Sequence, residues 1–374
     1  MKIGIVSPEF PPEKGGIQTY GFEFAQELAR RGHEVTVFTC PHAEGELEAT
    51  GLRIEPLLQL RRRLDRRILH LGPFDVWHAM NAAYSWLALE VPRVFVTVHG
   101  NDFLWPYQPV ARLDLRERLR LPFGSNADRW LGERLTGALV KRSLPRAAHI
   151  FTNSKYTRDI FLERYPGCRG RTTAAMVGVS PKFFSQARPP RPPGPPRLIT
   201  VCRLAEPHKN VDIVLRALAR LRTEFDFHYT VVGDGHLRAS LEKLTDESGL
   251  RDRVTFTGFV DAAELHPLLL TSDLFILTTS ATPIAYEGFG LVYLEAASCG
   301  LPVLAARIGG AVEAVEEGVT GMFVEEVTTE TVEDRLRHFL SGGAHFACNA
   351  CMSFAKTFSW GNVVDHCVDF YQSP

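Results

Sequence analysis

The chain has 374 residues, of which 45% are hydrophobic and 23% charged, and its formal net charge at pH 7 is −1. This length exceeds what one hydrophobic core accommodates, so two domains are expected, and the composition excludes a disordered or fibrous protein. No apolar run reaches the roughly 20 residues that a membrane-spanning helix needs, so we expect a soluble or, at most, peripheral protein.

The charges are distributed unevenly along the chain. Residues 1–185 hold 26 Lys and Arg against 19 Asp and Glu, whereas residues 186–374 hold 16 against 24. A basic first half favours an anionic partner, either a phosphate-bearing acceptor or an anionic membrane surface, although two oppositely charged halves that attract one another explain the pattern equally well. Nothing in this pattern indicates a nucleic-acid partner.

The first half begins with an apolar strand at residues 3–6, directly at the start of the chain, so no secretory signal is expected. A helix over residues 17–31 and a strand over 34–38 follow, and further strand-like runs lie at 76–79, 94–98 and 148–152. Residues 101–146 are helical in pattern without a clear strand. The seven cysteines are odd in number and mostly set in apolar runs, which is typical of reduced thiols in the cytoplasm.

A proline-rich segment at residues 188–197 separates the halves, because six prolines in ten residues do not form the interior of a helix or sheet. We therefore expect an N-terminal domain over 1–187 and a C-terminal domain over 198–357. The second half repeats the alternation of strands and helices, with strands at 198–202, 229–232, 254–256, 274–277 and 302–305 and a helix that Asn210 caps. Both domains are expected to be α/β, Rossmann-like and doubly wound, with a cleft at the carboxyl ends of their parallel strands.

Glycines and cations follow the first strand of each half. Gly15 and Gly16 precede the first helix, where backbone amides and the helix N-terminus favour an anion, although a glycine pair is also an ordinary helix start. They do not form the G-x-G-x-x-G pattern of dinucleotide-binding proteins, which disfavours a nicotinamide enzyme. Arg203 and Lys209 follow the strand at 198–202, where two cations suit a pyrophosphate. Solvated surface cations are the alternative.

Residues 287–295 (EGFGLVYLE) are the most informative segment. Gly288, Phe289 and Gly290 open a helix whose free amides suit a phosphate. Glu287 and Glu295 lie on either side of these amides, where carboxylates suit the hydroxyls of a sugar and a ribose. Two solvent-facing glutamates are the alternative, but the helix is otherwise apolar, and buried carboxylates need partners.

Glu287 and Glu295 match the E-x7-E motif of the family-4 retaining glycosyltransferases, which have the GT-B fold, and the chain resembles this family over essentially its whole length. Further motifs agree in order: Gly15 with Gly16, residues 75–78, 98–102, 152–154, 178–179, Arg203 with Lys209, and residues 233–235, 258–260 and 358–360. There are departures. Val177–Ser180 stands where the family commonly has Asn-Gly-Val-Asp, and Cys202 and Asn210 stand where it commonly has glycines.

The resemblance implies that Arg203 and Lys209 neutralise the donor pyrophosphate, that Glu287 contacts the sugar and Glu295 the ribose, and that His99 lies by the transferred sugar. It places the amides of Gly16, Phe289, Gly290 and the neighbouring Leu291 at phosphate or sugar, and the backbone near Val260 at the base. It also implies that a helix over residues 358–374 returns to the N-terminal domain. The expected catalytic residues are thus His99, Glu287, Arg203 and Lys209.

The sequence contains no Asp-x-Asp motif, so we expect no metal ion or other cofactor in the donor site. The expected reaction is a metal-independent, retaining sugar transfer from a UDP- or GDP-linked donor to a glycan, lipid-linked or small-molecule acceptor. Two alternatives stay open: a GT-B sugar-nucleotide epimerase and a non-catalytic sugar-nucleotide-binding protein. Cys348 and Cys351 form a lone C-x-x-C pair, for which a zinc site is not expected.

The basic stretch from Arg61 to Arg67 follows three leucines at 57, 58 and 60. Such a stretch is typical of a peripheral contact with an anionic membrane or of a grip on a phosphorylated acceptor, and a solvated helix face is the alternative. A cytoplasmic protein on the inner face of the membrane is expected on the first interpretation. The base, the sugar, the acceptor and the oligomeric state are not specified by any residue pattern.

Overall fold

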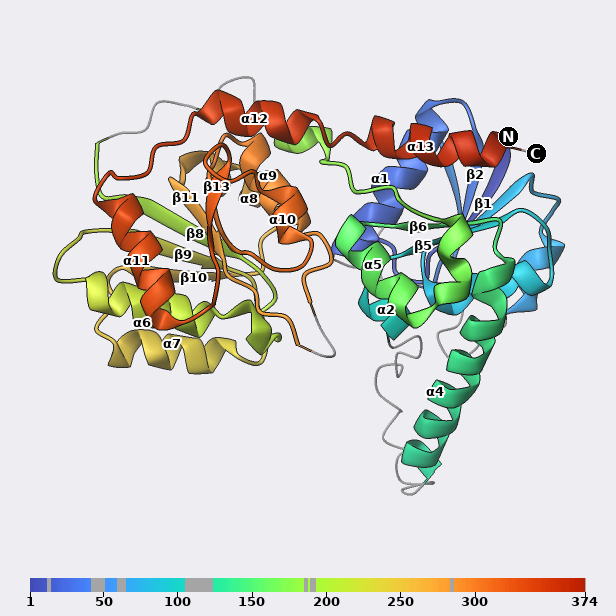
Figure 1. Ribbon diagram of the computed structural model, residues 1–374, viewed down its shortest axis with the longest axis horizontal. Helices are drawn as coiled ribbons and strands as arrows, with labels where there is room; N and C mark the ends of the chain where they lie inside the picture. The colour runs from blue at the N-terminus through green and yellow to red at the C-terminus, as the bar shows by residue number, and fades with distance from the viewer. Residues whose placement is uncertain are drawn as a thin grey trace. The chain divides into compact units, whose positions relative to one another are not determined.

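The computed structural model describes residues 1–11, 15–41, 51–58, 65–104, 124–184, 188, 193–282 and 286–373, with side chains described for all of these except 101 and 124–133. The chain divides into two compact units (Figure 1). Unit 1 comprises Met1–Gly178 and Trp360–Pro374, and unit 2 comprises Val179–Ser359.

This division lies before the proline-rich segment, not within it. The Val179 backbone pairs with Ser359, and the Phe183 carbonyl accepts hydrogen bonds from Ser298 and Cys299, so the chain has joined unit 2 by residue 183. Arg188 in turn donates to backbone carbonyls of unit 2. Residues 189–192 of the expected linker lie outside the described residues.

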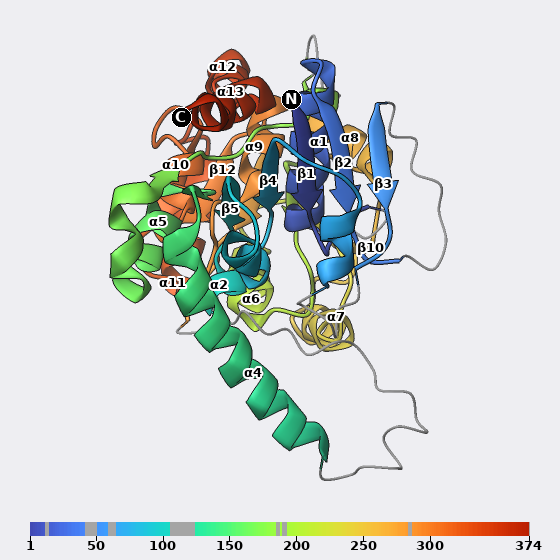
Figure 2. The same ribbon diagram turned by 90° about the vertical axis from the view of Figure 1, so that its right-hand side faces the viewer.

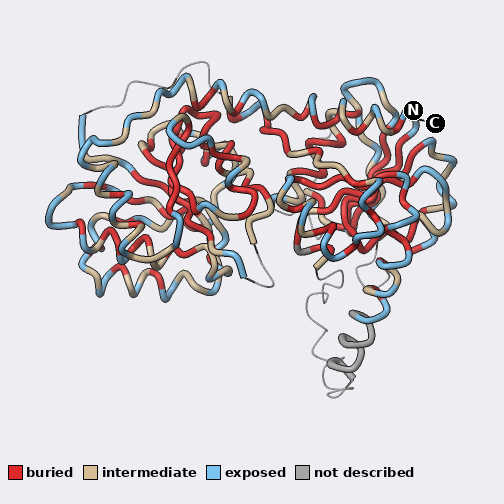
Figure 3. Tube along the Cα trace, viewed as in Figure 1, coloured by how far each residue is buried: buried red, intermediate tan, exposed pale blue. Residues whose placement is uncertain are grey.

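Unit 1 is built on a seven-stranded parallel sheet with the order β3-β2-β1-β4-β5-β6-β7. Apart from the exposed first residues of β1 and β2, the inner strands are buried, as expected for a parallel sheet covered on both faces, and form the red centre of unit 1 in Figure 3. The strands span β1 Lys2–Val6, β2 Glu34–Phe38, β3 Leu52–Glu55, β4 Val76–Ala79, β5 Val94–Val98, β6 His149–Thr152 and β7 Thr172–Ala174. The short edge strands β3 and β7 were not predicted.

Two helices far apart in sequence, α1 and α13, pack against each other in unit 1. The helices of unit 1 span α1 Gly16–Arg30, α2 Asn101–Leu104, α4 Gly124–Ser143, α5 Lys155–Arg164 and α13 Trp360–Gln372. Short 3-10 helices span η1 Arg66–His70, η2 Ala82–Leu89, η3 Leu144–Arg146 and η4 Pro166–Arg171. Figure 2 shows α4 extending away from the body of unit 1. Among the described residues, no helix is long and apolar enough to cross a membrane.

A buried polar cluster joins α13 to the sheet of unit 1. The imidazole of His78, in β4, forms a hydrogen bond with the Tyr371 hydroxyl through Nδ1 and with the Thr97 hydroxyl through Nε2, at 2.7 Å for the latter. Burial, and to a lesser degree the nearby His99, lowers the pKa of His78 to about 3. The ring is therefore neutral in the native state across the physiological pH range.

The depressed pKa of His78 predicts acid-sensitive stability. In the unfolded chain this imidazole protonates near pH 6.5, whereas in the folded chain it does so near pH 3. Its contribution to stability is complete above pH 6.5 and is lost as the pH falls, at about 1.4 kcal/mol per pH unit, or about 2 kcal/mol by pH 5. Urea unfolding measured from pH 7.5 to pH 5 checks this, with His78→Gln as the non-titrating variant. An equally steep decline in that variant would contradict the assignment.

Unit 2 is built on a six-stranded parallel sheet with the order β10-β9-β8-β11-β12-β13. In both sheets the strand order reverses beside the first strand, which in unit 2 is between β8 and β11. The strands span β8 Arg197–Val201, β9 His228–Val232, β10 Val254–Gly258, β11 Leu274–Leu277, β12 Val303–Ala306 and β13 Gly321–Val324. The predicted strands are present, and β13 is an addition.

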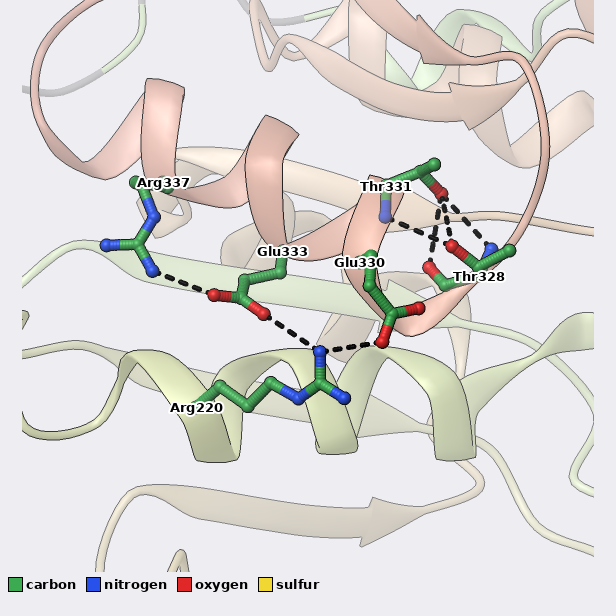
Figure 4. Close-up of polar contacts among 6 residues, drawn as sticks. All are labelled: Arg220, Thr328, Glu330, Thr331, Glu333 and Arg337. Atoms are coloured by element: carbon green, nitrogen blue, oxygen red, sulfur yellow. Dashed lines mark hydrogen bonds and ion pairs between the residues drawn. The ribbon is translucent and has the colours of Figure 1, made fainter.

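Helices cover both faces of the unit 2 sheet (Figure 1). On one face, α11 packs on α6 and α6 on α7, and on the other α12 packs on α9. Figure 4 shows the polar edge of the α6–α11 contact, where Arg220 joins Glu330 at 2.8 Å and Glu333 at 3.2 Å. The helices span α6 Val211–Leu221, α7 Arg238–Glu247, α8 Ala262–Thr271, α9 Leu291–Ser298, α10 Ala311–Ala314, α11 Thr329–Leu340 and α12 Cys348–Lys356, with 3-10 turns η5 Pro181–Phe183 and η6 Pro207–Lys209.

Candidate active site

The carboxyl ends of β8 and β11 mark the point where the strand order of unit 2 reverses. In open parallel sheets ligands bind outside the strands at such a point. The loop after β8 and the loop before α9 meet there. The Asn210 side-chain amide donates to the Thr278 carbonyl at 2.5 Å and to the Ser280 hydroxyl at 2.7 Å, which ties the first loop to the end of β11.

Asn210 thus has a different role from the predicted one. It stands at the residue before α6, but its backbone is left-handed, with φ 56°, and its side chain makes no capping hydrogen bond to the helix. The amide is committed to β11 instead. The prediction that the Asn210 side chain caps α6 is therefore wrong. The side chain instead fixes the loop that carries Lys209.

Two glycines after β9 hold the same loop from the other side. A Cβ on Gly233, whose φ is +135°, would lie 1.9 Å from the Cys202 carbonyl oxygen, and one on Gly235 would lie 2.3 Å from the Leu204 backbone. Backbone hydrogen bonds from Leu204 to Asp234 and from Leu237 to Leu204 close this contact. Only glycine permits so close an approach, so the loop between β8 and α6 is held on both sides.

Lys209 and Glu287 form a half-buried ion pair at this edge of the sheet. Lys209 Nζ lies 2.8 Å from Glu287 Oε2, and each side chain is 14% exposed. Burial lowers the pKa of Lys209, but the charge of Glu287, its hydrogen bond and the charge of Glu206 outweigh burial, and the net pKa is raised. Lys209 is therefore a fixed cation at neutral pH.

Arg203 is linked to Lys209 by Glu206, a residue that no sequence motif indicated. Arg203 Nη2 lies 2.9 Å from Glu206 Oε1, and Lys209 Nζ lies 3.7 Å from Glu206 Oε2. The Arg203 side chain is 73% exposed. Arg203, Glu206 and Lys209 line a hollow of about 380 Å³ that continues between α6 and α7. The structure thus brings both predicted cations together, with Glu206 between them.

The predicted amide turn directly precedes α9. Gly290 is the residue before the helix and is left-handed, with φ 86°, so a side chain there would be strained and would meet the Tyr293 ring at 2.4 Å. The first N–H groups of a helix have no partner within it and favour an anion. Leu291 is half-buried, and Phe289 is buried with its ring against Phe358.

A second glycine pair, Gly309 and Gly310, packs against the backbone of this turn. The Gly310 amide donates to the Glu287 carbonyl at 2.9 Å, and a Cβ on Gly310 would lie 2.1 Å from the Gly288 carbonyl oxygen. A Cβ on Gly309, whose φ is +64°, would lie 2.5 Å from the Glu287 carbonyl oxygen. The loop after β12 therefore fixes the backbone that presents Glu287 and the α9 amides, a role no sequence motif indicated.

The two remaining predicted residues of unit 2 follow different strands of the sheet, Val260 the edge strand β10 and Glu295 the inner strand β11. Glu295, within α9, is half-buried. Val260 follows β10, is half-buried, and stands beside Phe259, whose side chain is 53% exposed. Asp261 then opens α8 with a capping box. An exposed aromatic ring at a carboxyl edge suits a flat ligand group.

Within unit 1, His99 follows β5 and is held through its backbone. Its N–H donates to Asp102 Oδ1 at 2.8 Å and its carbonyl accepts from Asn153 Nδ2 at 3.2 Å. The His99 ring meets the Tyr20 ring edge-on, with centroids 4.7 Å apart. Its Nε2 is buried without a hydrogen-bond partner among the described residues, and burial lowers its pKa against the opposing effects of Asp102 and the Met80 carbonyl. A neutral imidazole with one unused nitrogen suits a hydroxyl-bearing ligand.

Asp102 was quoted only as part of a motif, yet it organises this turn. Its carboxylate accepts from the backbone N–H groups of His99, Gly100 and Ala82.

Gly15 and Gly16 precede α1 in the same unit. A Cβ on Gly16 would meet no described atom within 4 Å, so packing among these residues does not demand glycine there.

Several predictions fall partly or wholly outside the described residues. Of the basic stretch 61–67, residues 61–64 are not described, Arg66 pairs with Glu90 at 2.5 Å, and Arg67 pairs with Asp65. In the part of the chain that the structure describes, no group of three His, Cys, Asp or Glu side chains has the arrangement of metal ligands.

Comparison with known proteins identifies the family. The profile of Glycosyltransferase Family 4 matches residues 14–183, and that of Glycosyl transferases group 1 matches residues 182–356. Together they span nearly the whole chain. The chain belongs to the family-4 glycosyltransferases. It is a glycosyltransferase with the GT-B fold, as the E-x7-E motif predicted.

Two curated relatives of this glycosyltransferase match most of its length. One is the GDP-mannose-dependent alpha-(1-6)-phosphatidylinositol monomannoside mannosyltransferase of Mycolicibacterium smegmatis, 29% identical over 365 residues, with 88% of this chain and 86% of the relative covered. Another is the D-inositol 3-phosphate glycosyltransferase of Mycobacterium bovis, 28% identical over 393 residues, with 96% and 79% covered.

Solved structures of low sequence identity share the fold. HepE of Anabaena, in complex with UDP and glucose, has a TM-score of 0.72 at 20% identity, with both chains fully covered. The sucrose-phosphate synthase of Thermosynechococcus elongatus has a TM-score of 0.73 at 21% identity, with 99% of this chain and 98% of that one covered.

Proposed function

We propose that this glycosyltransferase takes a sugar from a UDP- or GDP-linked donor, without a metal ion, and transfers it with retention of anomeric configuration. The observation that carries the proposal is the half-buried pair of Lys209 and Glu287 beside the first turn of α9. A fixed ammonium and the N-terminal amides of a helix favour a diphosphate, and a carboxylate directly before them favours sugar hydroxyls.

Each residue then has a proposed role. Lys209, Arg203 and the amides of Gly288, Phe289, Gly290 and Leu291 stabilise the charge that develops on the leaving diphosphate, in place of a metal ion. Glu287 contacts the donor sugar and Glu295 the ribose, while the backbone near Val260 meets the base. Gly15 and Gly16 contact phosphate, and His99 orients the transferred sugar. The assignments for Gly15, Gly16 and His99 rest on the family resemblance and on their places within unit 1.

In the proposed reaction the acceptor hydroxyl attacks the anomeric carbon from the face that the diphosphate leaves. The bond from this carbon to the diphosphate oxygen breaks, and a bond to the acceptor oxygen forms. The hydroxyl proton passes to the departing phosphate oxygen. The residues of unit 2 bind and stabilise the diphosphate, so no side chain needs to become a covalent nucleophile.

For the acceptor we propose an alcohol that carries a phosphate, such as an inositol phosphate or a phosphoinositol lipid. The basic balance of residues 1–185 favours an anionic acceptor. The mycobacterial relatives are named for a phosphatidylinositol mannoside and an inositol 3-phosphate, which supports this class.

A panel of nucleotide sugars tests the donor. A donor present at about 100 times its dissociation constant adds about 2.7 kcal/mol to stability and raises the melting temperature measurably. UDP- or GDP-linked sugars are expected to do so, and unlinked sugars are not. A panel in which no nucleotide sugar raises the melting temperature contradicts the proposal.

We further propose that residues 61–67 give a cytoplasmic enzyme peripheral contact with anionic membranes. Each basic residue near such a surface contributes about 1 kcal/mol, an attraction that salt screens. The protein is expected to float with vesicles that contain phosphatidylserine at low salt and not with neutral vesicles. Changing Arg61, Arg62 and Arg63 to Ser should abolish flotation, with Arg251→Ser as the control. Failure of the unchanged protein to float would dismiss the membrane contact.

A further inference from the structure

Glu206 contacts both side chains that the proposed function assigns to the donor diphosphate. One carboxylate oxygen lies 2.9 Å from Arg203 Nη2 and the other lies 3.7 Å from Lys209 Nζ. Two cations placed to hold an anionic ligand are thus already joined by an anion of the protein itself.

The position of Glu206 is built into the backbone. Glu206 is the residue before the 3-10 turn η6, and its carbonyl accepts the Lys209 amide at 3.0 Å. The His208 amide lies in the same turn, and the His208 carbonyl accepts from Ser280 N at 2.8 Å. Because the turn is anchored at its far end, the carboxylate stays between the cations without depending on a long flexible loop.

Among the described residues, no additional positive charge offsets the carboxylate of Glu206, which can therefore compete with an anionic ligand for Arg203 and Lys209. His208 Nε2 lies 3.7 Å from Glu206, but burial and the charge of Lys209 lower the pKa of His208, so this imidazole is neutral near pH 7 and adds no positive charge. Glu287 shares Lys209, which leaves two carboxylates and two cations facing one another. A diphosphate adds negative charge to a cluster that is already balanced.

We propose that Glu206 is an internal counter-ion that competes with the diphosphate for Arg203 and Lys209 and thereby speeds release of the nucleoside diphosphate product. The inference rests on the proposed function. The product carries an ionised terminal phosphate, whereas in the donor that phosphate is esterified to the sugar, so the product bears more negative charge. Repulsion from Glu206 therefore weakens product binding more than donor binding.

The test compares Glu206→Gln, which removes the charge, with Glu206→Asp, which keeps it, and with Glu242→Gln as a control. Glu242 pairs with Arg238 at 2.7 Å on the surface of the same unit. Calorimetry on the full chain gives dissociation constants for UDP, GDP and inorganic pyrophosphate at 50 and 300 mM NaCl. Initial rates with the donor that turns over give its KM and the inhibition constant of its nucleoside diphosphate.

Glu206→Gln is expected to bind the preferred nucleoside diphosphate about five- to tenfold more tightly, since two exposed or half-exposed ion pairs no longer compete. Its KM for the donor should fall about twofold, and the gain should shrink at the higher salt concentration. Glu206→Asp and Glu242→Gln should stay within twofold of the wild type. A purely structural role for Glu206 predicts weaker binding in both Glu206 variants.

Two outcomes overturn the inference and are distinguishable. If the wild type binds UDP or GDP and Glu206→Gln binds it equally or less tightly, the counter-ion role is wrong and the proposed function stands. If the wild type binds none of the three probes, the proposed donor site is wrong and the inference falls with it.

Discussion

Replacement of Lys209 by methionine is expected to lower kcat/KM for the nucleotide-sugar donor by about 10³-fold. Lys209 is a half-buried cation held 2.8 Å from Glu287, whereas Arg203, the other cation that contacts Glu206, is exposed. Loss of one preorganised charge that stabilises a leaving group costs about 10²–10³ in rate, and weaker donor binding adds to this.

The same replacement also destabilises unit 2, and a second variant separates the two effects. Lys209→Met leaves Glu287 half-buried without its principal cation, at a cost of about 2 kcal/mol. In Lys209→Met/Glu287→Gln the unpaired charge is gone, so urea unfolding should return close to the wild-type stability, while the affinity for UDP or GDP, which Lys209 supports and the sugar-contacting Glu287 does not, stays reduced. Lys243→Met, which removes an exposed pair with Glu247 at 3.6 Å, is the control and should change neither. Recovery of the wild-type affinity for UDP or GDP in the double variant would show that Lys209 acts only on stability.

Replacement of His99 by glutamine is expected to lower kcat by about 100-fold while the affinity for UDP or GDP stays within twofold. The His99 backbone is fixed by Asp102 and Asn153, so the ring presents its buried Nε2 in one direction. A residue that orients the transferred sugar acts on the reacting group and not on the nucleotide.

The lowered pKa of His99 adds a pH criterion to this prediction. Because the imidazole is neutral at pH 7, kcat of the wild type should show no decline that depends on His99 between pH 8 and pH 7. Calorimetry measures the nucleotide affinity and initial rates measure kcat for His99→Gln. The same measurements on His149→Gln, which changes another histidine of unit 1, serve as the control. A His99 variant that loses nucleotide affinity in step with kcat contradicts the sugar-orienting role.

The interior of both sheets followed from the sequence, because buried parallel strands are continuous apolar runs such as residues 94–98 and 274–277. The edge strands did not. β3 alternates polar and apolar residues over four positions, and β7 has only three residues, so neither differs from a loop until a neighbouring strand pairs with it. β13 is buried but short and begins with glycine, which favours a turn when no neighbour is known.

The predicted site residues of unit 2 follow from motif spacing, whereas their supports do not. Lys209 and Glu287 are 78 positions apart, and only the sheet brings their charges together. Glu206 and Gly310 carry no motif of their own, since their roles depend on a 3-10 turn and on a close backbone approach. The division between the units was placed too late along the chain, because prolines mark a stiff segment and do not reveal which unit the preceding residues contact.

The anomeric configuration of the first-formed product distinguishes a retaining sugar transfer from an inverting one and from epimerisation of the donor. The full chain is mixed with UDP- and GDP-linked sugars whose anomeric bond is axial, with and without an inositol phosphate acceptor, and the anomeric protons are followed by NMR. Nucleoside diphosphate is expected to accumulate, and the transferred or released sugar is expected to carry the axial configuration of the donor first. An equatorial first product, or an altered sugar still attached to its nucleotide, would contradict it.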